Sequence, residues 1–511
     1  MAELRDSTLW ANRKCLLVCS AVAIASMQYG IDTAAVGGLQ AMPGFLMVFG
    51  YEDPASPLGY GIDSTVQQLM TSLMNLGSCI SAIAAGLFGA YFGRRHALWL
   101  ACIICLAAVS VQIGSTSKAG LYAGRLFLGF SNGFLVVFST VYCSEAAPAH
   151  LREIMVGLFS FYVNLGSIIG SVVDNYTSHY LSKLSYQIPL ASMFIVPVLL
   201  GIALFFVPES PRWLLHHDKH DEARKSLERL RYDHGNQLEL EWAEMIRGVA
   251  EEQRLSQSSG FLDMFRGNDL RRTLLCWGTI ASQSASGVWF FIGYQTYFLA
   301  LAGISKAFEY AIMNTCLGFI GVHLGLFAMN KLFGRRTIMI AGAIACGLCE
   351  LACGIASSVE PTSKATGNVL VAFTALFMFF YNAGVGVATG PIATEIVSSR
   401  LRAWTVGSAN GLGYFLAWLV AFCSPYFINP EDLNWGPQYT YIWAASNFIC
   451  VLWFYFFLPE TKARSLEELD EIFEAGIGAR KFRLYECRIV EEAKHDVFGD
   501  EKVEEVAKQA A

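Results

Sequence analysis

Twelve stretches of roughly 20 mostly apolar residues constrain the fold of this chain more than any other feature of its sequence. A helix of about 20 residues crosses the hydrocarbon core of a bilayer, and there the backbone must satisfy its own hydrogen bonds. The sequence therefore predicts an all-α polytopic membrane protein with twelve transmembrane helices. The stretches cover residues 15–36, 66–92, 97–116, 119–142, 154–174, 187–207, 273–299, 307–330, 337–357, 367–392, 403–427 and 438–458.

Composition excludes an ordinary soluble protein, because 54% of the residues are hydrophobic and only 15% are charged. The first apolar stretch begins near Cys15 and carries no small-residue cleavage site, so we expect it to stay in the membrane. A net charge of −6 gives no basic footprint for nucleic acid. Phosphate-binding glycine motifs and zinc-ligand spacings are absent from the sequence, so we expect no enzymatic activity, no cofactor and no metal.

The basic residues predict how the helices are oriented. Of the 36 Lys and Arg residues, 31 lie on the side that carries both termini, whereas the opposite loops hold Lys118, Lys183, Lys306 and Lys364. Because basic residues are retained on the cytosolic side, both termini and the central loop are predicted to be cytosolic.

The positions of the cysteines favour a role in helix packing. Nearly all 14 lie inside the predicted helices, which argues against a disulfide framework. Cys346, Cys349 and Cys353 share one helical face and are conceivable metal ligands. Small, weakly polar side chains are common where membrane helices pack, so packing is the favoured interpretation.

Three motifs recur in the same order at offsets of 241 to 251 residues, which predicts two six-helix halves. Such halves, joined by a charged loop, are typical of transporters that rock around a central site. The predicted parts are an N-terminus (1–14), a first half (15–207), a loop with short helices (208–271), a second half (272–458) and a tail (459–511). The motif pairs are Gly93-Arg94-Arg95 with Gly334-Arg335-Arg336, Glu145 and Arg152 with Glu395 and Arg402, and Pro208-Glu209 with Pro459-Glu460.

The charged residues of these motifs suggest a cytosolic gate. A Glu and an Arg seven residues apart at helix ends can pair with each other or with the Arg-rich turn of a neighbouring helix. Topology alone explains the Gly-Arg-Arg turns as well as a gate does, whereas matching Glu and Arg residues in both halves favour a gate. The candidate gate residues are Arg94, Arg95, Glu145, Arg152, Glu209, Arg212, Arg335, Arg336, Glu395, Arg402 and Glu460.

The sequence resembles the sugar porter family of the major facilitator superfamily, which implies the two-half architecture and transport of a small molecule. Finer details resemble the fungal branch of alpha-glucoside and maltose proton symporters, namely residues 293–298, 398–402 and 434–436. The family resemblance rests on Gly93-Arg94-Arg95, Gly124-Arg125 with Gly129 and Gly133, Glu145 to Arg152, Pro208 to Leu215, Gly334-Arg335-Arg336, and Pro459 to Lys462 with Ser465 to Glu468.

Asp32 and Arg125 are the candidate proton-coupling pair. Asp32 interrupts an apolar helix, where a carboxylate costs about 2.5 to 3.5 kcal/mol and needs a partner, water or a proton. Arg125 is the only basic residue deep in any predicted helix, so the two are expected to pair. The resemblance implies the same, because proton symporters of the family have an Asp on helix one and an Arg on helix four. A static buried ion pair is the alternative.

Sugar recognition needs side chains that donate and accept hydrogen bonds beside an aromatic face. The resemblance places helices five, seven and ten around the cavity, although each amide could equally bond another helix. Departures from the family pattern at Trp289, Gly293 and Gly390 change the predicted pocket shape. The candidate substrate-binding residues are Asn164, Gln283, Ser284, Trp289, Tyr294 and Asn382.

These features together predict a plasma-membrane, multi-pass sugar importer that uses proton symport and works as a monomer. A facilitator or exporter of another polar or secondary metabolite is the first alternative, because the substituted pocket residues allow it. A non-transporting sugar sensor is the second, although the tail 459–511 is short for a signalling extension.

Overall fold

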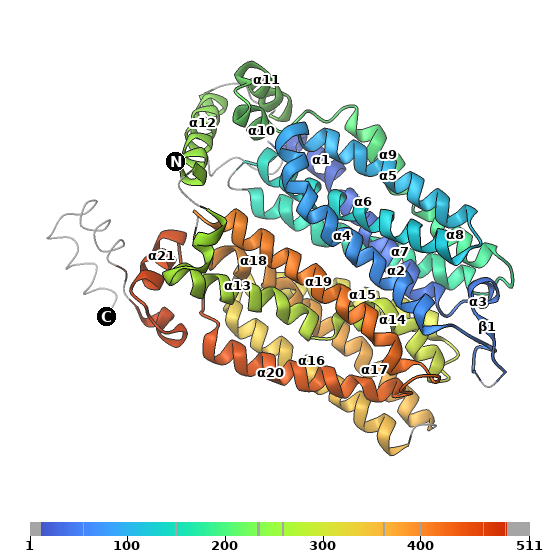
Figure 1. The fold of residues 1–511 in the computed structure, drawn as a ribbon. Coiled ribbons are helices and arrows are strands. Elements are labelled where there is room, and N and C mark those ends of the chain that lie inside the picture. Colours follow the sequence, from blue (N-terminus) through green and yellow to red (C-terminus); the bar gives the residue numbers. More distant parts are fainter. Residues whose placement is uncertain are drawn as a thin grey trace.

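The computed structural model describes residues 12–54, 56–148, 151–231, 236–257, 260–360, 363–398, 400–462, 464–485 and 487. Helices form two bundles that lie side by side, the first coloured blue to cyan and the second yellow-green to red (Figure 1). The predicted all-helical membrane fold is confirmed. Within the described residues, eleven helical spans are long and apolar enough to cross a membrane.

The first bundle holds six of these spans. Its first span is made of α1 and α2, and its last of α8 and α9. A short helix and a two-stranded antiparallel hairpin, in which Tyr51 pairs with Gly61, follow the first span. The elements are α1 (Arg13–Ala23), α2 (Ala25–Leu39), α3 (Pro43–Phe49), β1 (Tyr51–Glu52), β2 (Tyr60–Gly61), α4 (Ser64–Phe92), α5 (Arg94–Gly114), α6 (Lys118–Ala146), α7 (Arg152–Thr177), α8 (Leu184–Ser192) and α9 (Ile195–Leu204).

The central loop forms short helices, and the second bundle follows it. The loop elements are α10 (Pro211–His216), α11 (His220–Leu230), α12 (Asn236–Gln257) and the 3-10 turn η3 (Phe261–Phe265). The second bundle and the end of the chain contain α13 (Gly267–Ala285), α14 (Val288–Leu301), α15 (Ala307–Lys331), α16 (Arg335–Val359), α17 (Lys364–Tyr381), the π-turn η4 (Asn382–Gly386), α18 (Val387–Glu395), α19 (Arg402–Ile428), η5 (Gly436–Tyr439), α20 (Thr440–Phe457), α21 (Leu466–Glu474) and η6 (Ala479–Leu484).

The stretch predicted as one helix over residues 273–299 is divided into α13 and α14. Gly287 separates them in the left-handed conformation, with φ of 78°. Residues that carry a side chain rarely adopt that backbone conformation, so glycine is the residue that permits the break. The twelfth crossing is therefore a discontinuous helix, and neither of its parts is among the eleven continuous spans.

Small residues allow the helices of the first half to approach closely. A Cβ atom at Gly30 on α2 would lie 2.0 Å from the carbonyl oxygen of Val163 on α7, and one at Gly129 on α6 would lie 2.1 Å from that of Met74 on α4. Close backbone contact of this kind holds membrane helices together, because lipid gives them no hydrophobic driving force to associate.

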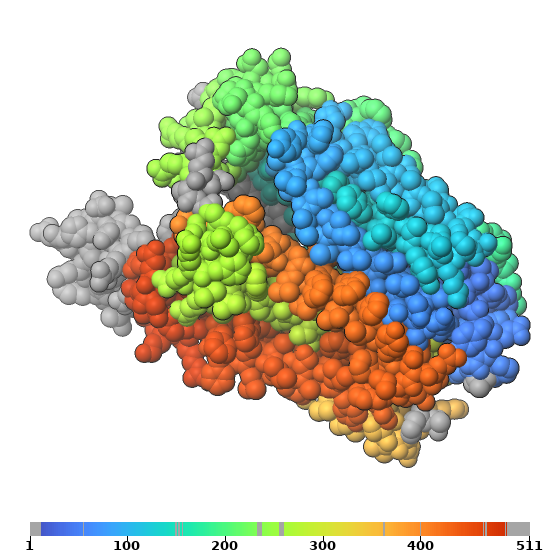
Figure 2. All heavy atoms as spheres, in the orientation of Figure 1, coloured from blue at the N-terminus to red at the C-terminus, as the bar shows by residue number. Residues whose placement is uncertain are grey.

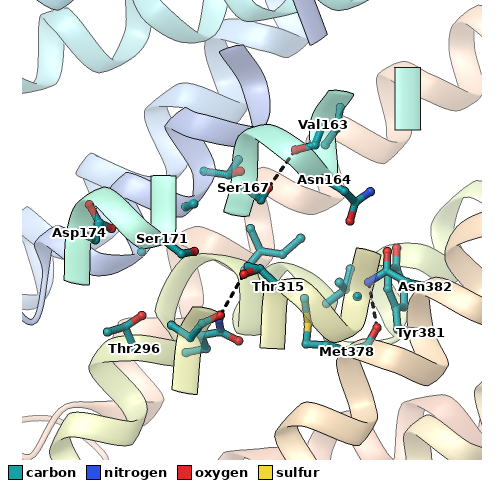
Figure 3. A pocket seen from close by; sticks show the side chains of 18 of the residues that line it. Val163, Asn164, Ser167, Ser171, Asp174, Thr296, Thr315, Met378, Tyr381 and Asn382 are labelled. Carbon is teal, nitrogen blue, oxygen red and sulfur yellow. Dashed lines mark hydrogen bonds between the residues drawn. The ribbon is translucent and has the colours of Figure 1, made fainter. Parts of the chain in front are cut away.

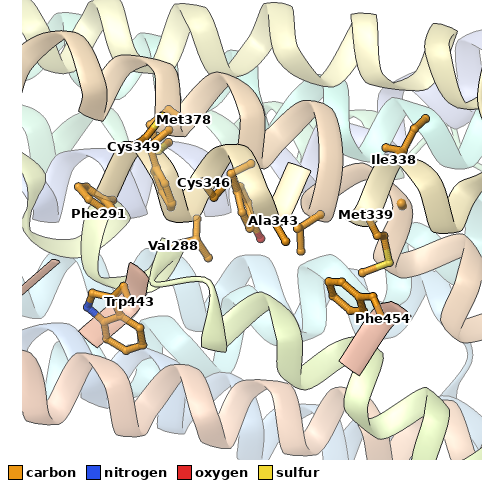
Figure 4. Close-up of a cluster of buried hydrophobic side chains, with 14 of the residues drawn as sticks. Val288, Phe291, Ile338, Met339, Ala343, Cys346, Cys349, Met378, Trp443 and Phe454 are labelled. Atoms are coloured by element: carbon orange, nitrogen blue, oxygen red, sulfur yellow. The ribbon is translucent and has the colours of Figure 1, made fainter. Parts of the chain in front are cut away.

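The second half packs around a buried apolar cluster on α14, α16, α17 and α20 (Figure 4). Cys346 and Cys349 lie in this cluster beside Val288 and Phe291, and Cys353 belongs to it as well. The three cysteines therefore pack as the sequence favoured.

The ends of the bundle carry different structures. We call the end with α10, α11, α12 and α21 the loop end, and the end with β1 and β2 the hairpin end (Figure 1). The surface is hollowed between the halves toward the loop end, and the halves meet at the hairpin end (Figure 2). The molecule is therefore open at the loop end and closed at the hairpin end.

Neutral amides join the halves at the hairpin end. Gln67 on α4 donates to the side-chain oxygen of Gln40 at 2.8 Å, and Asn429, directly after α19, donates to that of Gln67 at 3.0 Å. Gln40 also donates to the backbone oxygen of Gly293 on α14 at 3.0 Å. We call Gln40, Gln67 and Asn429 the amide seam. Beside it, Ser64 at the start of α4 donates to the carboxylate of Asp432 in the second half, so neutral amides and one acidic residue close this end together.

Candidate transport site

A cavity of about 150 Å³ lies between the two halves. Its walls come from α2 and α7 of the first half and from α14, α15 and the α17–η4 junction of the second (Figure 3). Apolar and aromatic side chains such as Trp289, Ile292 and Phe308 share the lining with polar ones. The polar lining residues are Tyr29, Thr33, Asn164, Ser167, Ser171, Asp174, Gln295, Thr296, Thr315, Tyr381 and Asn382.

Three of the predicted substrate-binding residues line this cavity: Asn164, Trp289 and Asn382. The amide nitrogen of Asn164 donates to the backbone oxygen of Ser160 at 2.8 Å, and that of Asn382 to the backbone oxygen of Met378 at 2.9 Å. These bonds hold both amides in place and leave their oxygens available to a ligand. Asn382 also begins the π-turn η4, a local widening that is frequent at functional sites.

The other three predicted residues lie outside the cavity lining. Ser284 accepts a hydrogen bond from the indole of Trp289 at 3.1 Å, and the hydroxyl of Tyr294 donates to the backbone oxygen of Ala421 at 2.6 Å. Gln283 is half-buried on α13, before the break at Gly287. Helical spacing from Trp289 through Ile292 to Thr296 marks the cavity face of α14, and Tyr294 lies on the opposite face.

Asp32 and Arg125 form a buried ion pair between α2 and α6, with 0% and 1% of their side chains exposed. Asn132, about two turns further along α6 than Arg125, donates to the second carboxylate oxygen of Asp32 at 2.9 Å. Arg125 also donates to the backbone oxygen of Met70 on α4 at 2.9 Å. The expected contact is present, and Asn132 is a partner that the sequence analysis missed.

The Asp32–Arg125 ion pair and the cavity share one helix. Tyr29 and Thr33 on α2 line the cavity, whereas Asp32 on the same turn faces α6. A change at Asp32 that shifts α2 against α6 therefore shifts the cavity wall as well.

Glu145 and Glu209 organise the loop end of the first half. Arg94 donates two bonds to Glu145, at 2.8 and 3.0 Å. Glu209 accepts bonds from the backbone N–H groups of Arg94 and Arg95, at 3.0 and 3.1 Å, and so caps the N-terminus of α5. Arg95 donates to the backbone oxygen of Leu204 at 2.9 Å.

The second half repeats the arrangement. Arg335 pairs with Glu395 at 2.6 Å, and Glu460 accepts from the backbone N–H of Arg335 at 2.9 Å. Arg336 donates to the backbone oxygen of Phe454 at 3.4 Å. Each arginine–glutamate pair lies within its own half, so neither pair bridges the halves in this conformation.

Three candidate gate residues remain. The side chain of Arg152 lies outside the described part of the structure. Arg212 pairs at 2.9 Å with Glu252 on α12, inside the central loop. A hydrogen bond from His216, assisted by the charge of Arg212, lowers the pKa of Glu252. The remaining candidate, Arg402, begins α19.

Two buried carboxylates escaped the sequence analysis, although each interrupts an apolar stretch. Asp174 on α7 lines the cavity and is 2% exposed. Glu350 on α16 is fully buried and accepts a bond of 2.8 Å from Asn447, which also donates at 3.2 Å to the backbone oxygen of Ser286 at the break between α13 and α14. An acidic residue inside a predicted span was the signal for both.

Comparison with known proteins places this geometry among transporters. The family model described as "Sugar (and other) transporter" matches residues 18–473. The general alpha-glucoside permease of Saccharomyces cerevisiae is 30% identical over 93% of this chain and 78% of its own length. The major facilitator-type transporter ecdD of Aspergillus rugulosus is also 30% identical, over 95% of this chain and 92% of its own length.

Solved structures show the same fold. The xylose transporter XylE from E. coli, in a partially occluded inward open conformation, superposes with a TM-score of 0.71 at 19% identity, covering 89% of this chain and 99% of that one. The two-half helical architecture is thus shared across most of both chains.

Proposed function

The chain belongs to the sugar porter family of transporters, and from this membership we propose that it imports a sugar together with protons by alternating access. The alpha-glucoside permeases among its relatives support a sugar as the substrate class. In this proposal the loop end is cytosolic, the membrane is the plasma membrane, and the transporter works as a monomer. Import is the proposed direction.

The Asp32–Arg125 pair is the observation that carries the proton part of the proposal. Both side chains are buried, and removing one partner of such a pair costs roughly 3–5 kcal/mol because a buried charge is left unpaired. A proton on Asp32 removes one charge and weakens the hold of Arg125 on α2. Because the cavity wall moves with α2, proton binding and substrate access become linked.

The closed hairpin end and the two ion-paired motifs at the loop end support alternating access. In the proposed cycle, the amide seam opens to admit substrate and proton from outside, while the loop end closes. Seam contacts between neutral amides cost little to break and remake in water, because water replaces their hydrogen bonds. The amide contacts on the side that opens to the cell exterior are thus weak and reversible.

A facilitator or exporter of another metabolite on the same fold is the second candidate. Trp289 and Phe308 give the cavity a large apolar surface, and two relatives are named only as major facilitator-type or MFS transporters. Both facts are compatible with a substrate other than a sugar.

Uptake of labelled maltose, glucose, lactose, xylose and a sugar acid in a transporter-deficient host tests the proposal. External pH is recorded during each addition, with and without a protonophore. We expect concentrative, protonophore-sensitive uptake of at least one neutral sugar with external alkalinisation. No uptake of any sugar by correctly localised protein would favour the second candidate, and uptake without proton movement would favour a facilitator.

A further inference from the structure

Asp174 places a carboxylate in the cavity wall at the last turn of α7. It shares one helical face with Asn164, Ser167 and Ser171, since the four residues follow at spacings of three and four. Figure 3 shows its carboxyl group at one end of the cavity, beyond Ser171. Asp174 therefore belongs to the same surface as the amide of Asn164.

The protein around Asp174 does not satisfy the hydrogen-bonding capacity of its carboxyl group. Among the described residues its Oδ1 atom has no hydrogen-bond partner, although the side chain is 98% buried. Gly38 on α2 makes room for it, because a Cβ atom there would lie 2.1 Å from Oδ2 of Asp174. The C-terminal end of a helix also disfavours a negative charge. Packing gives no reason for a carboxylate here, whereas a ligand would.

The charged residues that line the cavity limit which ligand can bind to that carboxyl group. Within the described lining, Asp174 is the one carboxylate, and no Lys, Arg or His is present. The charge of Arg125 is held by Asp32 behind the wall. An unpaired carboxyl group in a low-dielectric site is stabilised by a ligand that donates hydrogen bonds or carries positive charge, whereas an anionic ligand would find no counter-charge in this lining.

We propose that Asp174 is a specificity-determining residue that accepts a hydrogen bond from a hydroxyl or ammonium group of the substrate and excludes anionic substrates. This inference rests on the proposed function and adds the substrate class to it, namely neutral polyhydroxylated compounds or their amino derivatives. Ser171 and Thr296, which line the same cavity, complete a polar surface around that contact.

Glucose, glucosamine and glucuronate have the same sugar ring but differ in charge, so their binding tests the proposal. Binding to purified protein is measured at pH 7 from ligand-induced shifts of the thermal denaturation midpoint over a concentration series. The variants are Asp174→Asn, which removes the charge in nearly the same shape, and Asp174→Glu, which keeps it. Asp63→Asn is the matched control, because it makes the same carboxylate-to-amide change at an exposed residue outside the cavity lining.

We expect the natural protein to bind glucose or glucosamine and to reject glucuronate. Asp174→Asn should weaken binding of the preferred probe by about tenfold, because an amide oxygen is a weaker acceptor than a carboxylate, and should admit glucuronate. Asp174→Glu should still reject glucuronate, and Asp63→Asn should leave affinity and selectivity unchanged.

Two results would overturn the inference while leaving sugar transport intact: unchanged affinity and selectivity in Asp174→Asn, or equal binding of glucose and glucuronate by the natural protein. Failure of the natural protein to bind glucose or glucosamine would contradict recognition of these rings at Asp174, whereas the proposed function itself would fail only if no sugar of the uptake screen were transported. A transporter that binds sugar without moving protons would contradict proton coupling only.

Discussion

Glu209 and Glu460 are equivalent residues 251 positions apart, and each carboxylate caps the helix that begins with an arginine pair. The cap distances are 3.0 Å to the backbone nitrogen of Arg94 and 2.9 Å to that of Arg335. Acidic groups at helix N-termini satisfy exposed N–H groups and oppose the helix dipole. The repeated motifs therefore act first as structural joints of each half.

Removing either cap should destabilise the protein to a similar extent. Glu209→Ala and Glu460→Ala are each expected to cost about 1–2 kcal/mol, seen as a lower denaturation midpoint in detergent. Glu309→Ala is the control, because Glu309 is exposed at the start of α15 and pairs with the exposed Lys306. Equal midpoints for the control and the two cap variants would contradict this assignment.

Replacing Arg94 with lysine should destabilise the protein. Its guanidinium forms a two-pronged contact with Glu145 at 2.8 and 3.0 Å, which an ammonium group cannot reproduce. A double-mutant cycle with Arg94→Lys and Glu145→Gln should give a coupling energy of about 1–3 kcal/mol. The exposed pair Arg254–Glu251 is the reference and should show little coupling. Full stability of Arg94→Lys would argue against the fork as the stabilising contact.

Gly287 and Gly303 separate two effects of a positive φ. Both are left-handed, at 78° and 76°, but only Gly287 is crowded. A Cβ atom at Gly287 would lie 2.7 Å from Trp443 and 2.9 Å from Glu350, whereas one at Gly303 meets nothing within 4 Å. Gly303→Ala should cost about 1–2 kcal/mol for backbone strain.

Gly287→Ala should cost more than Gly303→Ala and should also lower the rate of substrate exchange. The added methyl group pushes against Glu350 and Trp443, and α14, which follows the break, lines the cavity. Denaturation midpoints and exchange rates of the two variants make the comparison. Identical behaviour would mean that the contacts at the break have no part in positioning α14.

The contact between α10 and α12 should depend on pH in a defined direction. Bonds from His216 and Arg212 lower the pKa of Glu252 in the folded loop. Its contribution is present above the ordinary carboxylate pKa of about 4.3 and is lost as pH falls through the lowered value. Hydrogen exchange in α12, corrected for intrinsic rates, should be steady from pH 8 to 6 and increase near pH 4. Glu252→Gln should show no such step, and a step retained in that variant would contradict the assignment.

Hydropathy and internal repetition sufficed to predict the helical fold. The arginine turns, the helix-end glutamates and Arg125, the ion-pair partner of Asp32, could also be predicted, because charged residues are rare in apolar helices. Asp174 and Glu350 carried the same signal. Their positions within otherwise apolar spans could have identified them as functional candidates.

Other features depend on how each helix is rotated. The helix α14 is apolar on nearly every face, so its sequence did not say that Tyr294 turns away from the cavity while Gln295 and Thr296 face it. The rotation is set by the break at Gly287 and by contacts with other helices. The amide seam combines residues far apart in the chain, such as Gln40 and Asn429, and no local pattern connects them.

The central claim is that Asp32 carries the coupled proton, and Asp32→Asn tests it most directly. Asparagine keeps the shape and can still accept a bond from Arg125, but it cannot take up a proton. Asp63→Asn is the control, since Asp63 is an exposed cap residue of α4 whose amide can cap as well.

Both variants are reconstituted in proteoliposomes with the sugar that the uptake screen identifies. We predict that Asp32→Asn retains exchange of labelled for unlabelled sugar at equilibrium but loses accumulation driven by an imposed pH gradient, while Asp63→Asn keeps both activities. Accumulation against a gradient by Asp32→Asn at the level of the natural protein would contradict the account.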